Sequence, residues 1–196
     1  MQQTFIFFGR SGSGKGTQAE MLKKYLQDQK GLEPIYIETG QKFRNFTDQS
    51  NYSAQLTKEV MSTGGLMPVF LPIWLWTTDM VNKFDGKRDL ILDGLCRRPD
   101  EAPVLDSAIK FFKLEKPIVF YIKTSDAWSF ERLKSRGRGD DSDEYIKSRL
   151  SWFEWNVLPA MAYFYDNKDY NFFEINGEQT VEEVHKERIS KVESVQ

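Results

Sequence analysis

The sequence predicts a single α/β domain built on a five-stranded parallel β-sheet that helices cover on both faces. Three observations carry this prediction. Short apolar runs rich in β-branched and aromatic residues alternate with segments of helical periodicity along the chain. The first of these runs leads directly into a glycine-rich turn. The chain has 196 residues, 40% of them hydrophobic and 29% charged, which is enough for one compact core.

The strands and helices are expected in a regular order. A strand over residues 4–8 runs into Gly9, and a helix with Ala19, Leu22 and Leu26 on one face then continues to Gly31. Further strands are expected at 35–37, 90–92, 118–122 and 172–175, and helical segments at 41–84, after Pro99, at 127–135, at 144–165 and at the end of the chain.

Two connections do not fit a minimal βαβ pattern. The link between the second and third strands spans about fifty residues, whereas a crossover needs only about 10–12. We therefore expect an inserted helical lobe there. Residues 136–144, RGRGDDSDE, form a polar, glycine-containing turn between two helices, and we expect a small flap at this place.

The glycine-rich turn fits the phosphate-binding motif G-x-x-x-x-G-K over residues 9–15, and it lies between a predicted strand and a predicted helix, as the motif requires. Glycines permit positive φ and close backbone approach, so that N–H groups can point at phosphate oxygens. The alternative is a glycine-rich connector without a ligand. We expect a P-loop NTPase three-layer fold that binds a nucleoside triphosphate through Gly12, Ser13, Gly14, Lys15, Gly16 and Thr17. Gly16 stands where Ser or Thr normally supplies a metal-binding hydroxyl, and Thr17 follows one place later as a possible magnesium ligand.

Several motifs in order and spacing resemble those of the adenylate kinase family of nucleoside monophosphate kinases, from about residue 4 to residue 185. GRSGSGKGTQAE resembles GxPGSGKGTQ, TGQKFR at 39–44 resembles TGDxxR, and LDGLCRRPDEA at 92–102 resembles LDGFPRTxxQA. The stretch RLKSRGRGDDSDEYIKSRL has the family's R-x-x-x-R, R-x-D-D and later arginine.

This resemblance implies a division of the chain. The core would comprise residues 1–39, 73–135 and 145–196, with an acceptor-binding lobe at about 40–72 and a short lid at about 136–144. The chain lacks the cysteine ligands of the family's longer, zinc-bearing lid, so we expect no zinc. The partners would be ATP with Mg²⁺ and a nucleoside monophosphate, and the protein would be a monomer, as is usual in the family.

The resemblance also implies roles for single residues. The catalytic residues would be Lys15, Arg97, Arg138 and Arg149. Arg136 would lie against the adenine of ATP, and Asp93 would hold Mg²⁺ through water. The nucleoside monophosphate would be bound by Thr39, Gly40, Arg44, Gly94, Arg97 and Glu101.

Each of these assignments has a plainer alternative. The arginines between residues 132 and 149 lie next to Asp140, Asp141 and Asp143 and, taken alone, fit a solvated helix junction equally well. Planar guanidinium groups match phosphate oxygens bidentately, which favours the role of lid clamps for Arg138 and Arg149. Asp93 ends an apolar strand beside Gly94, where a turn or capping aspartate is also common.

The implied reaction moves the γ-phosphoryl group of MgATP to AMP and gives two ADP. The acceptor oxygen is already an anion, so catalysis needs positioning and charge neutralisation and no side-chain base. Glu101 stands where the family has an adenine-reading Gln, and an ionised Glu offers only acceptors. GMP, CMP or UMP therefore stay open as acceptors. A non-catalytic nucleotide sensor and a kinase for a small metabolite are further alternatives.

Composition excludes other classes of function. The formal net charge is −2, so we expect no generally basic surface for nucleic acid. Cys96 is the single cysteine, which excludes a disulfide framework and favours a reducing compartment, the cytoplasm.

The most apolar window, residues 66–76, has eleven residues and two prolines, whereas a membrane-spanning helix needs roughly 20 apolar residues. We expect a buried helix start there, with Phe70, Trp74 and Trp76 packed in the interior, and no membrane partner.

Overall fold

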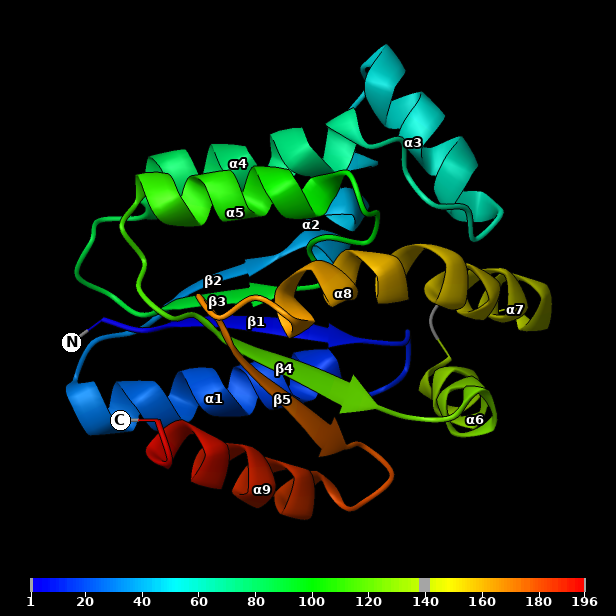
Figure 1. The fold of residues 1–196 in the computed structure, drawn as a ribbon. Coiled ribbons are helices and arrows are strands. Elements are labelled where there is room, and N and C mark those ends of the chain that lie inside the picture. Colours follow the sequence, from blue (N-terminus) through cyan, green and yellow to red (C-terminus); the bar gives the residue numbers. More distant parts are fainter. Residues whose placement is uncertain (1, 138–141, 196) are drawn as a thin grey trace.

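The computed structural model describes residues 2–137 and 142–195 and contains a twisted sheet between two layers of helices (Figure 1). The strands are β1 (Thr4–Gly9), β2 (Ile35–Glu38), β3 (Leu90–Asp93), β4 (Ile118–Lys123) and β5 (Asn171–Asn176). The helices are α1 (Lys15–Lys30), α2 (Thr39–Phe46), α3 (Tyr52–Ser62), α4 (Phe70–Lys83), α5 (Glu101–Phe111), α6 (Asp126–Arg136), α7 (Asp143–Trp152), α8 (Leu158–Tyr165) and α9 (Val181–Glu193).

The sheet is five-stranded, with the order β2-β3-β1-β4-β5 and parallel pairing throughout. Every residue of β1 is buried, because this strand lies at the centre and both of its faces are covered. One apolar core joins the sheet to α4, α5 and α8, and a second joins the opposite face to α1 and α9. This arrangement confirms the predicted α/β three-layer fold.

The long connection between β2 and β3 contains α2, α3 and α4, which stand above the sheet edge in Figure 1. A small apolar cluster of its own holds this region together, formed by Phe43, Phe46, Ala54, Met67 and Leu71. These cluster residues come from α2, α3, the loop after α3 and the beginning of α4, whereas Trp76 and Met80, further along α4, pack in the first main core.

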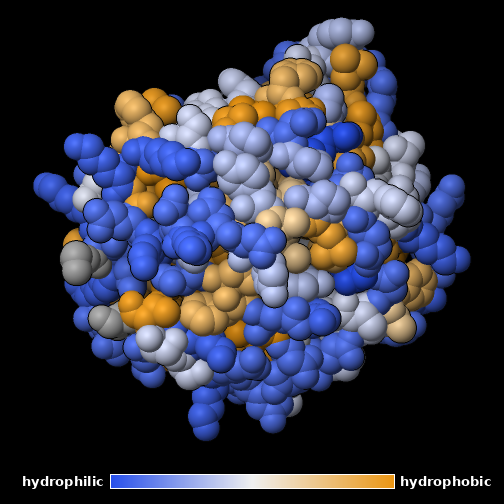
Figure 2. All heavy atoms as spheres, in the orientation of Figure 1, coloured by the Kyte–Doolittle hydropathy of each residue, from blue (hydrophilic) through white to orange (hydrophobic). Residues whose placement is uncertain are grey.

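The aromatic residues of α4 do not all pack as expected. Trp76 is fully buried in the main core, and Trp74 is half-exposed with its ring 5.6 Å from that of Phe46. Phe70 is 68% exposed, so the prediction of an interior position for it is wrong. The cause is position: Phe70 is the first residue of α4, and the buried residues of this helix are Leu71, Pro72, Trp76, Asp79 and Met80. Exposed apolar atoms are not unusual in this protein, since Figure 2 shows them scattered among hydrophilic ones on the face in view.

The helical region near the C-terminal end is interrupted. The sequence predicts one helical segment over 144–165, whereas the structure has α7, a π-helical turn over Phe153–Val157, and then α8. Such π turns insert an extra residue into a helix and often occur near functional sites. Ser142 caps α7, since its Oγ accepts a hydrogen bond from the backbone N–H of Tyr145.

The helices of residues 2–137 and 142–195 are all too short or too polar to cross a membrane.

Helix α9 carries an arginine in the second core. Arg188 is fully buried, and its guanidinium lies 6.0 Å from the ring of Phe7 and 5.8 Å from that of Phe120. Its Nη2 contacts Nδ1 of His185 at 2.5 Å, while Nε and Nη1 have no hydrogen-bond partner in the part of the chain that is described. Burial lowers the pKa of Arg188 to about 9, because the apolar surroundings disfavour its charge.

Replacing Arg188 with Met is therefore expected to stabilise the fold. Removing a buried charge without a carboxylate partner should raise the free energy of unfolding by about 1–2 kcal/mol and Tm by roughly 2–8 °C. Thermal unfolding followed by circular dichroism measures this shift, with the exposed Lys186→Met on the same helix as the control. A lower Tm for the Arg188 variant would mean that the contacts with Phe7 and Phe120 outweigh the cost of burying the charge.

Candidate active site

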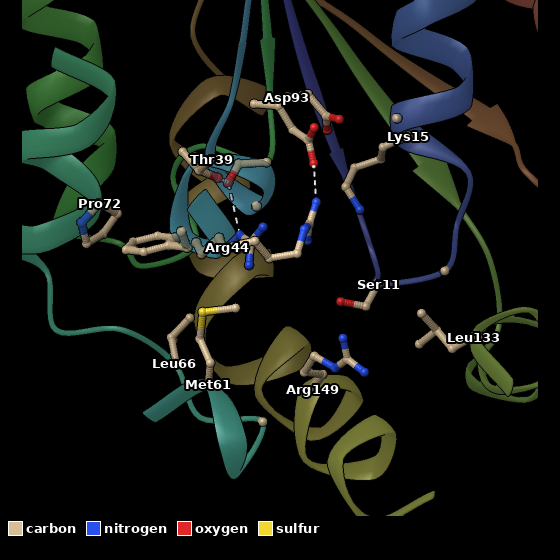
Figure 3. Close-up of a pocket in the computed structure, with 18 of the residues that line it drawn as sticks. Ser11, Lys15, Thr39, Arg44, Met61, Leu66, Pro72, Asp93, Leu133 and Arg149 are labelled. Atoms are coloured by element: carbon tan, nitrogen blue, oxygen red, sulfur yellow. Dashed lines mark hydrogen bonds and ion pairs between the residues drawn. The ribbon is translucent and has the colours of Figure 1, made fainter. Parts of the chain in front are cut away.

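A cavity of about 650 Å³ lies at the carboxyl ends of β1, β2 and β3. This is the edge of a parallel sheet where ligands of open α/β folds bind. Figure 3 shows Lys15, Arg44 and Arg149 around this space, each from a different helix, with Asp93 at the end of β3. Six basic residues line the cavity among the described residues: Lys15, Arg44, Arg97, Arg132, Arg136 and Arg149. Since the chain as a whole has a net charge of −2, this concentration of cations makes the cavity suited to anions.

The glycine-rich loop turns sharply between β1 and α1. Gly12 has φ +83°, and a Cβ at this position would lie 2.5 Å from the carbonyl oxygen of Ser129. Gly14 has φ +93° and begins α1 without any side-chain cap. The first N–H groups of α1 are therefore not used by a capping side chain, and the first turn contains no acidic residue. An uncapped helix N-terminus of this kind carries partial positive charge that attracts phosphate.

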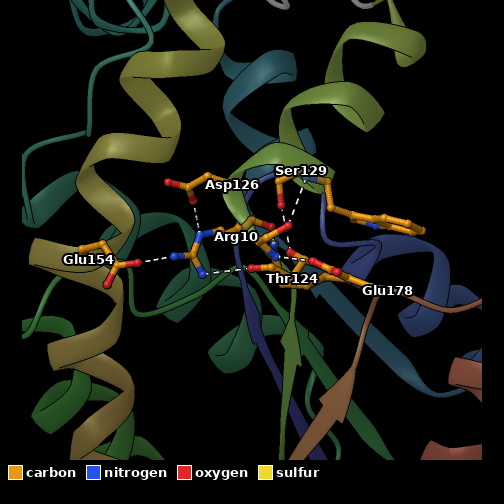
Figure 4. Close-up of polar contacts among 9 residues, drawn as sticks. Arg10, Thr124, Asp126, Ser129, Glu154 and Glu178 are labelled. Atoms are coloured by element: carbon orange, nitrogen blue, oxygen red, sulfur yellow. Dashed lines mark hydrogen bonds and ion pairs between the residues drawn. The ribbon is translucent and has the colours of Figure 1, made fainter.

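Arg10 anchors the beginning of the loop to the helices beyond it (Figure 4). Its guanidinium forms ion pairs with Asp126 at the start of α6 and with Glu154 in the π-helical turn. It also donates to the carbonyl of Thr124 at 3.1 Å and lies 4.4 Å from the ring centre of Phe153. These contacts fix the loop relative to the two helices that flank residues 137–142.

Lys15 extends from α1 back across the loop. Its Nζ donates to the carbonyl oxygens of Gly9 and Arg10 at 2.8 and 2.7 Å. Burial lowers the pKa of Lys15 to about 8, although the carboxylate of Asp93 acts in the opposite direction. A phosphate group in the cavity would replace the lost hydration and keep the ammonium charged.

Asp93 lies beneath the loop at the end of β3. It is buried, its Oδ2 accepts a hydrogen bond from the hydroxyl of Tyr36 at 3.0 Å, and a Cβ on Gly16 would be 3.5 Å from the same oxygen. Burial raises the pKa of Asp93, and the nearby Lys15 opposes that shift.

The donor set of the cavity fits magnesium only together with a nucleotide. Among residues 2–137 and 142–195, no group of three or more His, Cys, Asp or Glu side chains is arranged to hold a metal ion. Mg²⁺ is typically bound by one or two carboxylates, phosphate oxygens and water. Asp93, close to the start of α1, supplies the carboxylate that such a site requires, and Thr17 lines the same cavity.

The opposite end of the cavity has two arginines that converge on glycines. A Cβ on Gly40 would lie 3.5 Å from Nη1 of Arg44 and 3.7 Å from Nη2 of Arg97, and a Cβ on Gly94 would lie 3.1 Å from that same Nη2. Thr39 Oγ1 and Arg97 Nε both donate to the carbonyl of Gly94, at 2.6 and 2.9 Å. The two guanidinium groups are thus held close together, which favours a dianionic group between them.

Nearby charges act on both Arg97 and Arg44. Burial lowers the pKa of Arg97, and the nearby Arg44 acts in the same direction, while carboxylates such as Glu101 oppose it. Arg44 in turn pairs with Glu38, with 3.3 Å between Nη2 and Oε1. An anion bound here would relieve the repulsion between the two guanidinium groups.

Glu101 shapes the loop that carries Arg97. Its Oε1 accepts hydrogen bonds from the backbone N–H groups of Arg97 and Arg98, each at 3.1 Å. The preceding Cys96 is buried at φ +53°, in the left-handed region that costs a non-glycine residue about 1–2 kcal/mol. Proline, which the resembled family has at this position, requires φ near −65° and does not fit this conformation. Glu101 therefore stabilises a strained turn.

The second carboxylate oxygen of Glu101, Oε2, does not accept the hydrogen bonds from the backbone of Arg97 and Arg98. Oε2 is buried without a hydrogen-bond partner in the described part of the chain, and Glu101 lines the cavity. Burial raises the pKa of Glu101, while the positive charge of Arg97 and the backbone donors act against that shift. One carboxylate oxygen is thus left for a ligand.

The structure brings most of the predicted site residues into one place. Those that line the cavity are Gly12, Gly14, Lys15, Gly16, Thr17, Thr39, Gly40, Arg44, Asp93, Gly94, Arg97, Glu101, Arg136 and Arg149. Ser13 does not: it is buried under the loop, and its N–H donates to the carbonyl of Arg10 at 3.1 Å. Arg138 lies outside the described residues.

Sequence reasoning missed other residues of the cavity wall. Arg132 lines it, one helical turn before Arg136, and the spacing R-x-x-x-R contains the signal that could have found it. Trp152 and the loop from Gly64 to Met67 also line it, and they belong to no motif that sequence reasoning used.

Comparison with known proteins gives a consistent result. The sequence model of the family described as Adenylate kinase matches residues 7–169. The adenylate kinase of Azobacteroides pseudotrichonymphae is 31% identical over 193 residues, which cover 96% of both chains. The adenylate kinase of Flavobacterium psychrophilum is 31% identical over 95% of this chain and 96% of its own. Adenylate kinase 1 of Synechocystis is 32% identical over 94% of each. With a cationic cavity beside a P-loop and these matches over nearly its whole length, the chain belongs to the adenylate kinase family of nucleoside monophosphate kinases.

Proposed function

We propose that the protein transfers the γ-phosphoryl group of MgATP to AMP and forms two molecules of ADP. The observation that carries the proposal is the layout of one cavity. An uncapped helix N-terminus and Lys15 lie at one end, and the converging Arg44 and Arg97 lie at the other. This layout suits two phosphate chains that meet end to end. The relatives named adenylate kinase favour AMP as the acceptor.

On the ATP side, the backbone of residues 12–17 would hold the phosphates, and Lys15 would lie across the terminal ones. Arg136 would contact the adenine, as the family resemblance implies. Arg132 lines the same wall from the preceding turn of α6 and would share this task. Asp93 would hold Mg²⁺ through water, with Thr17 as a further ligand, and the ion would neutralise charge on the phosphates.

On the acceptor side, Arg44 and Arg97 would grip the phosphate of the monophosphate. Thr39, Gly40, Gly94 and Glu101 would surround the rest of the acceptor. The acceptor-binding lobe would comprise about residues 40–72, and the apolar cluster around Phe43, separate from the main cores, supports this boundary. A short lid at about 136–144 would cover the ATP, and residues 1–39, 73–135 and 145–196 would form the core.

The chemistry needs no general base in this arrangement. The acceptor phosphate oxygen is already anionic, so the protein has to align it with the γ-phosphorus and neutralise the charge that accumulates. Lys15, Arg97 and Arg149 line the cavity from different elements and would perform this neutralisation. Arg138 would join them by its place in the motif. Exclusion of water would prevent hydrolysis of ATP.

A transfer assay with labelled ATP tests the proposal. Purified protein is incubated with Mg²⁺, ATP labelled in the γ-phosphate, and one of AMP, GMP, CMP, UMP or dTMP. We expect the label to appear in the diphosphate of the acceptor, at highest kcat/KM for AMP, and little free phosphate without an acceptor. Binding of nucleotides without labelled diphosphate for any acceptor would favour the sensor alternative.

GMP is the second candidate acceptor, and Glu101 is the specific observation that favours it. A carboxylate Oε2 accepts hydrogen bonds from the N1–H and N2–H of guanine, whereas adenine N1 requires a donor. Burial raises the pKa of Glu101, and a protonated Oε2 would supply that donor. The carboxyl group can thus serve either base, depending on its proton.

The variant Glu101→Gln separates these possibilities. Gln keeps one oxygen for the N–H groups of Arg97 and Arg98 and offers a permanent donor in place of Oε2. We expect the ratio of kcat/KM for AMP over GMP to increase about tenfold, which corresponds to one charged hydrogen bond. The exposed Glu115→Gln is the control. An unchanged acceptor ranking would show that Glu101 does not read the base.

We further propose that the protein acts as a monomer in the cytoplasm, which agrees with its single buried thiol.

A further inference from the structure

We propose that Trp152 is a positioning residue that couples the acceptor-binding lobe to helix α7 and to Arg97. This inference rests on the proposed function, because it concerns the binding of the acceptor.

The loop between α3 and α4 packs against α7, and the carbonyl group of Gly64 in this loop accepts hydrogen bonds from α7. The indole Nε1 of Trp152 donates to the carbonyl oxygen of Gly64 at 3.1 Å, and Ser148 Oγ, one helical turn earlier, donates to the same oxygen at 3.3 Å. Gly64 has φ +66°, and a Cβ there would lie 2.7 Å from the carbonyl oxygen of Tyr145. Only glycine permits this close approach, so the loop and the helix are fitted to each other.

The same indole ring lies beside Arg97, which would hold the phosphate of the acceptor. The guanidinium carbon of Arg97 is 6.0 Å from the ring centre of Trp152, within the range of a cation–π contact. Arg97 is partly buried near the like charge of Arg44, so the electron-rich face of the indole helps to stabilise it. Trp152 also lines the cavity itself.

Two neighbouring side chains extend this connection. Arg98, next to Arg97, donates from Nε to the carbonyl of Met67 at 2.9 Å and from Nη2 to that of Leu66 at 3.3 Å. Arg149, three residues before Trp152 on α7, lines the cavity as well. Trp152 therefore touches the lobe and the acceptor arginine at once, and it shares a helix with Arg149.

The physical consequence concerns the acceptor and not ATP. If the loop after α3 loses its support on α7, the lobe and Arg97 become less ordered before the acceptor binds. The acceptor then has to supply the ordering free energy, which weakens its apparent affinity. The P-loop and α1 make none of these contacts, so ATP binding should stay the same.

The variant Trp152→Phe tests the coupling, since it keeps an aromatic ring and removes the N–H donor. We expect KM for the acceptor monophosphate and its Kd from calorimetry to increase about 5- to 20-fold. KM for ATP should change by less than about twofold. Ser148→Ala removes the second donor to Gly64 and should give a smaller increase of about two- to threefold, again for the acceptor alone.

Trp155→Phe is the matched control, because Trp155 lies three residues later and is 82% exposed. It should change neither constant. Equal effects of Trp152→Phe on both substrates, or no effect on the acceptor, would overturn the proposal. If Trp152→Phe fails to fold in a thermal melt, the acceptor-specific change in Ser148→Ala decides. Absence of kinase activity in the unaltered protein would instead contradict the proposed function, and the calorimetric Kd keeps the two outcomes apart.

Discussion

Replacing Lys15 with Met is expected to lower kcat by about 10³-fold, a loss of roughly 4 kcal/mol of transition-state stabilisation. Lys15 Nζ lies at the start of the cavity within 2.8 Å of the loop carbonyls, where it can follow the phosphoryl group during transfer. Met has a similar length and no charge. A coupled assay of ADP formation measures the change, and Lys24→Met on the exposed side of α1 is the control.

The pKa of Lys15 adds a second readout to the same variant. Because burial lowers this pKa to about 8, the free protein loses the ammonium charge above that pH, and ATP binding then requires uptake of a proton. The Kd for ATP should therefore increase by about fivefold between pH 8 and pH 9 in the unaltered protein. In Lys15→Met this pH dependence should be absent. The same slope in both proteins, or nearly unchanged turnover in the variant, would exclude the proposed role.

Replacing Arg97 with Ala is expected to lower kcat/KM for the acceptor by about 10³-fold while KM for ATP changes little. Arg97 is partly buried and its Nη2 lies near the same point as Nη1 of Arg44, so its removal leaves the acceptor phosphate with one guanidinium instead of two. Arg97→Lys should recover only a small part of the activity, because an ammonium cannot bind two phosphate oxygens in a planar fork. Steady-state kinetics with each substrate varied in turn measure these effects.

Comparing KM for ATP with KM for the acceptor decides how the result for the Arg97 variant is interpreted. Arg97 Nε also donates to the carbonyl of Gly94, so some loss could come from a disordered loop. Thermal unfolding of the variant measures that contribution. Arg88→Ala, at a partly exposed arginine that pairs with Asp85 and does not line the cavity, controls for loss of an arginine charge. An equal increase in KM for ATP and in KM for the acceptor would contradict a specific role in holding the acceptor phosphate.

Local sequence patterns were enough to predict the fold and many of the residues that line the cavity. The alternation of buried strands and amphipathic helices predicts a parallel sheet, and the phosphate-binding motif places Lys15 at its edge. The motifs around Arg44 and Arg97 predict residues that do line one cavity with Lys15. These predictions succeed because each depends on residues close together in sequence.

Contacts between distant segments were not predictable in the same way. Gly64 and Trp152 are 88 residues apart, and their hydrogen bond depends on how α3, α4 and α7 pack together. The π-helical turn at Phe153–Val157 falls within a helical sequence pattern that gives no sign of it, and two of its residues contact Arg10, which is more than 140 residues away in sequence. Phe70 is exposed because burial depends on which side of α4 faces the core.

The most direct test of the central claim is a crystal structure with a non-hydrolysable ATP analogue and AMP bound together with Mg²⁺. We predict the triphosphate along the backbone of Gly12 and of residues 14–17, and the acceptor phosphate between Arg44 and Arg97. The two phosphate groups should face each other beside Lys15. An acceptor bound elsewhere, with neither arginine in contact with its phosphate, would contradict the claim that this cavity joins two nucleotides for phosphoryl transfer.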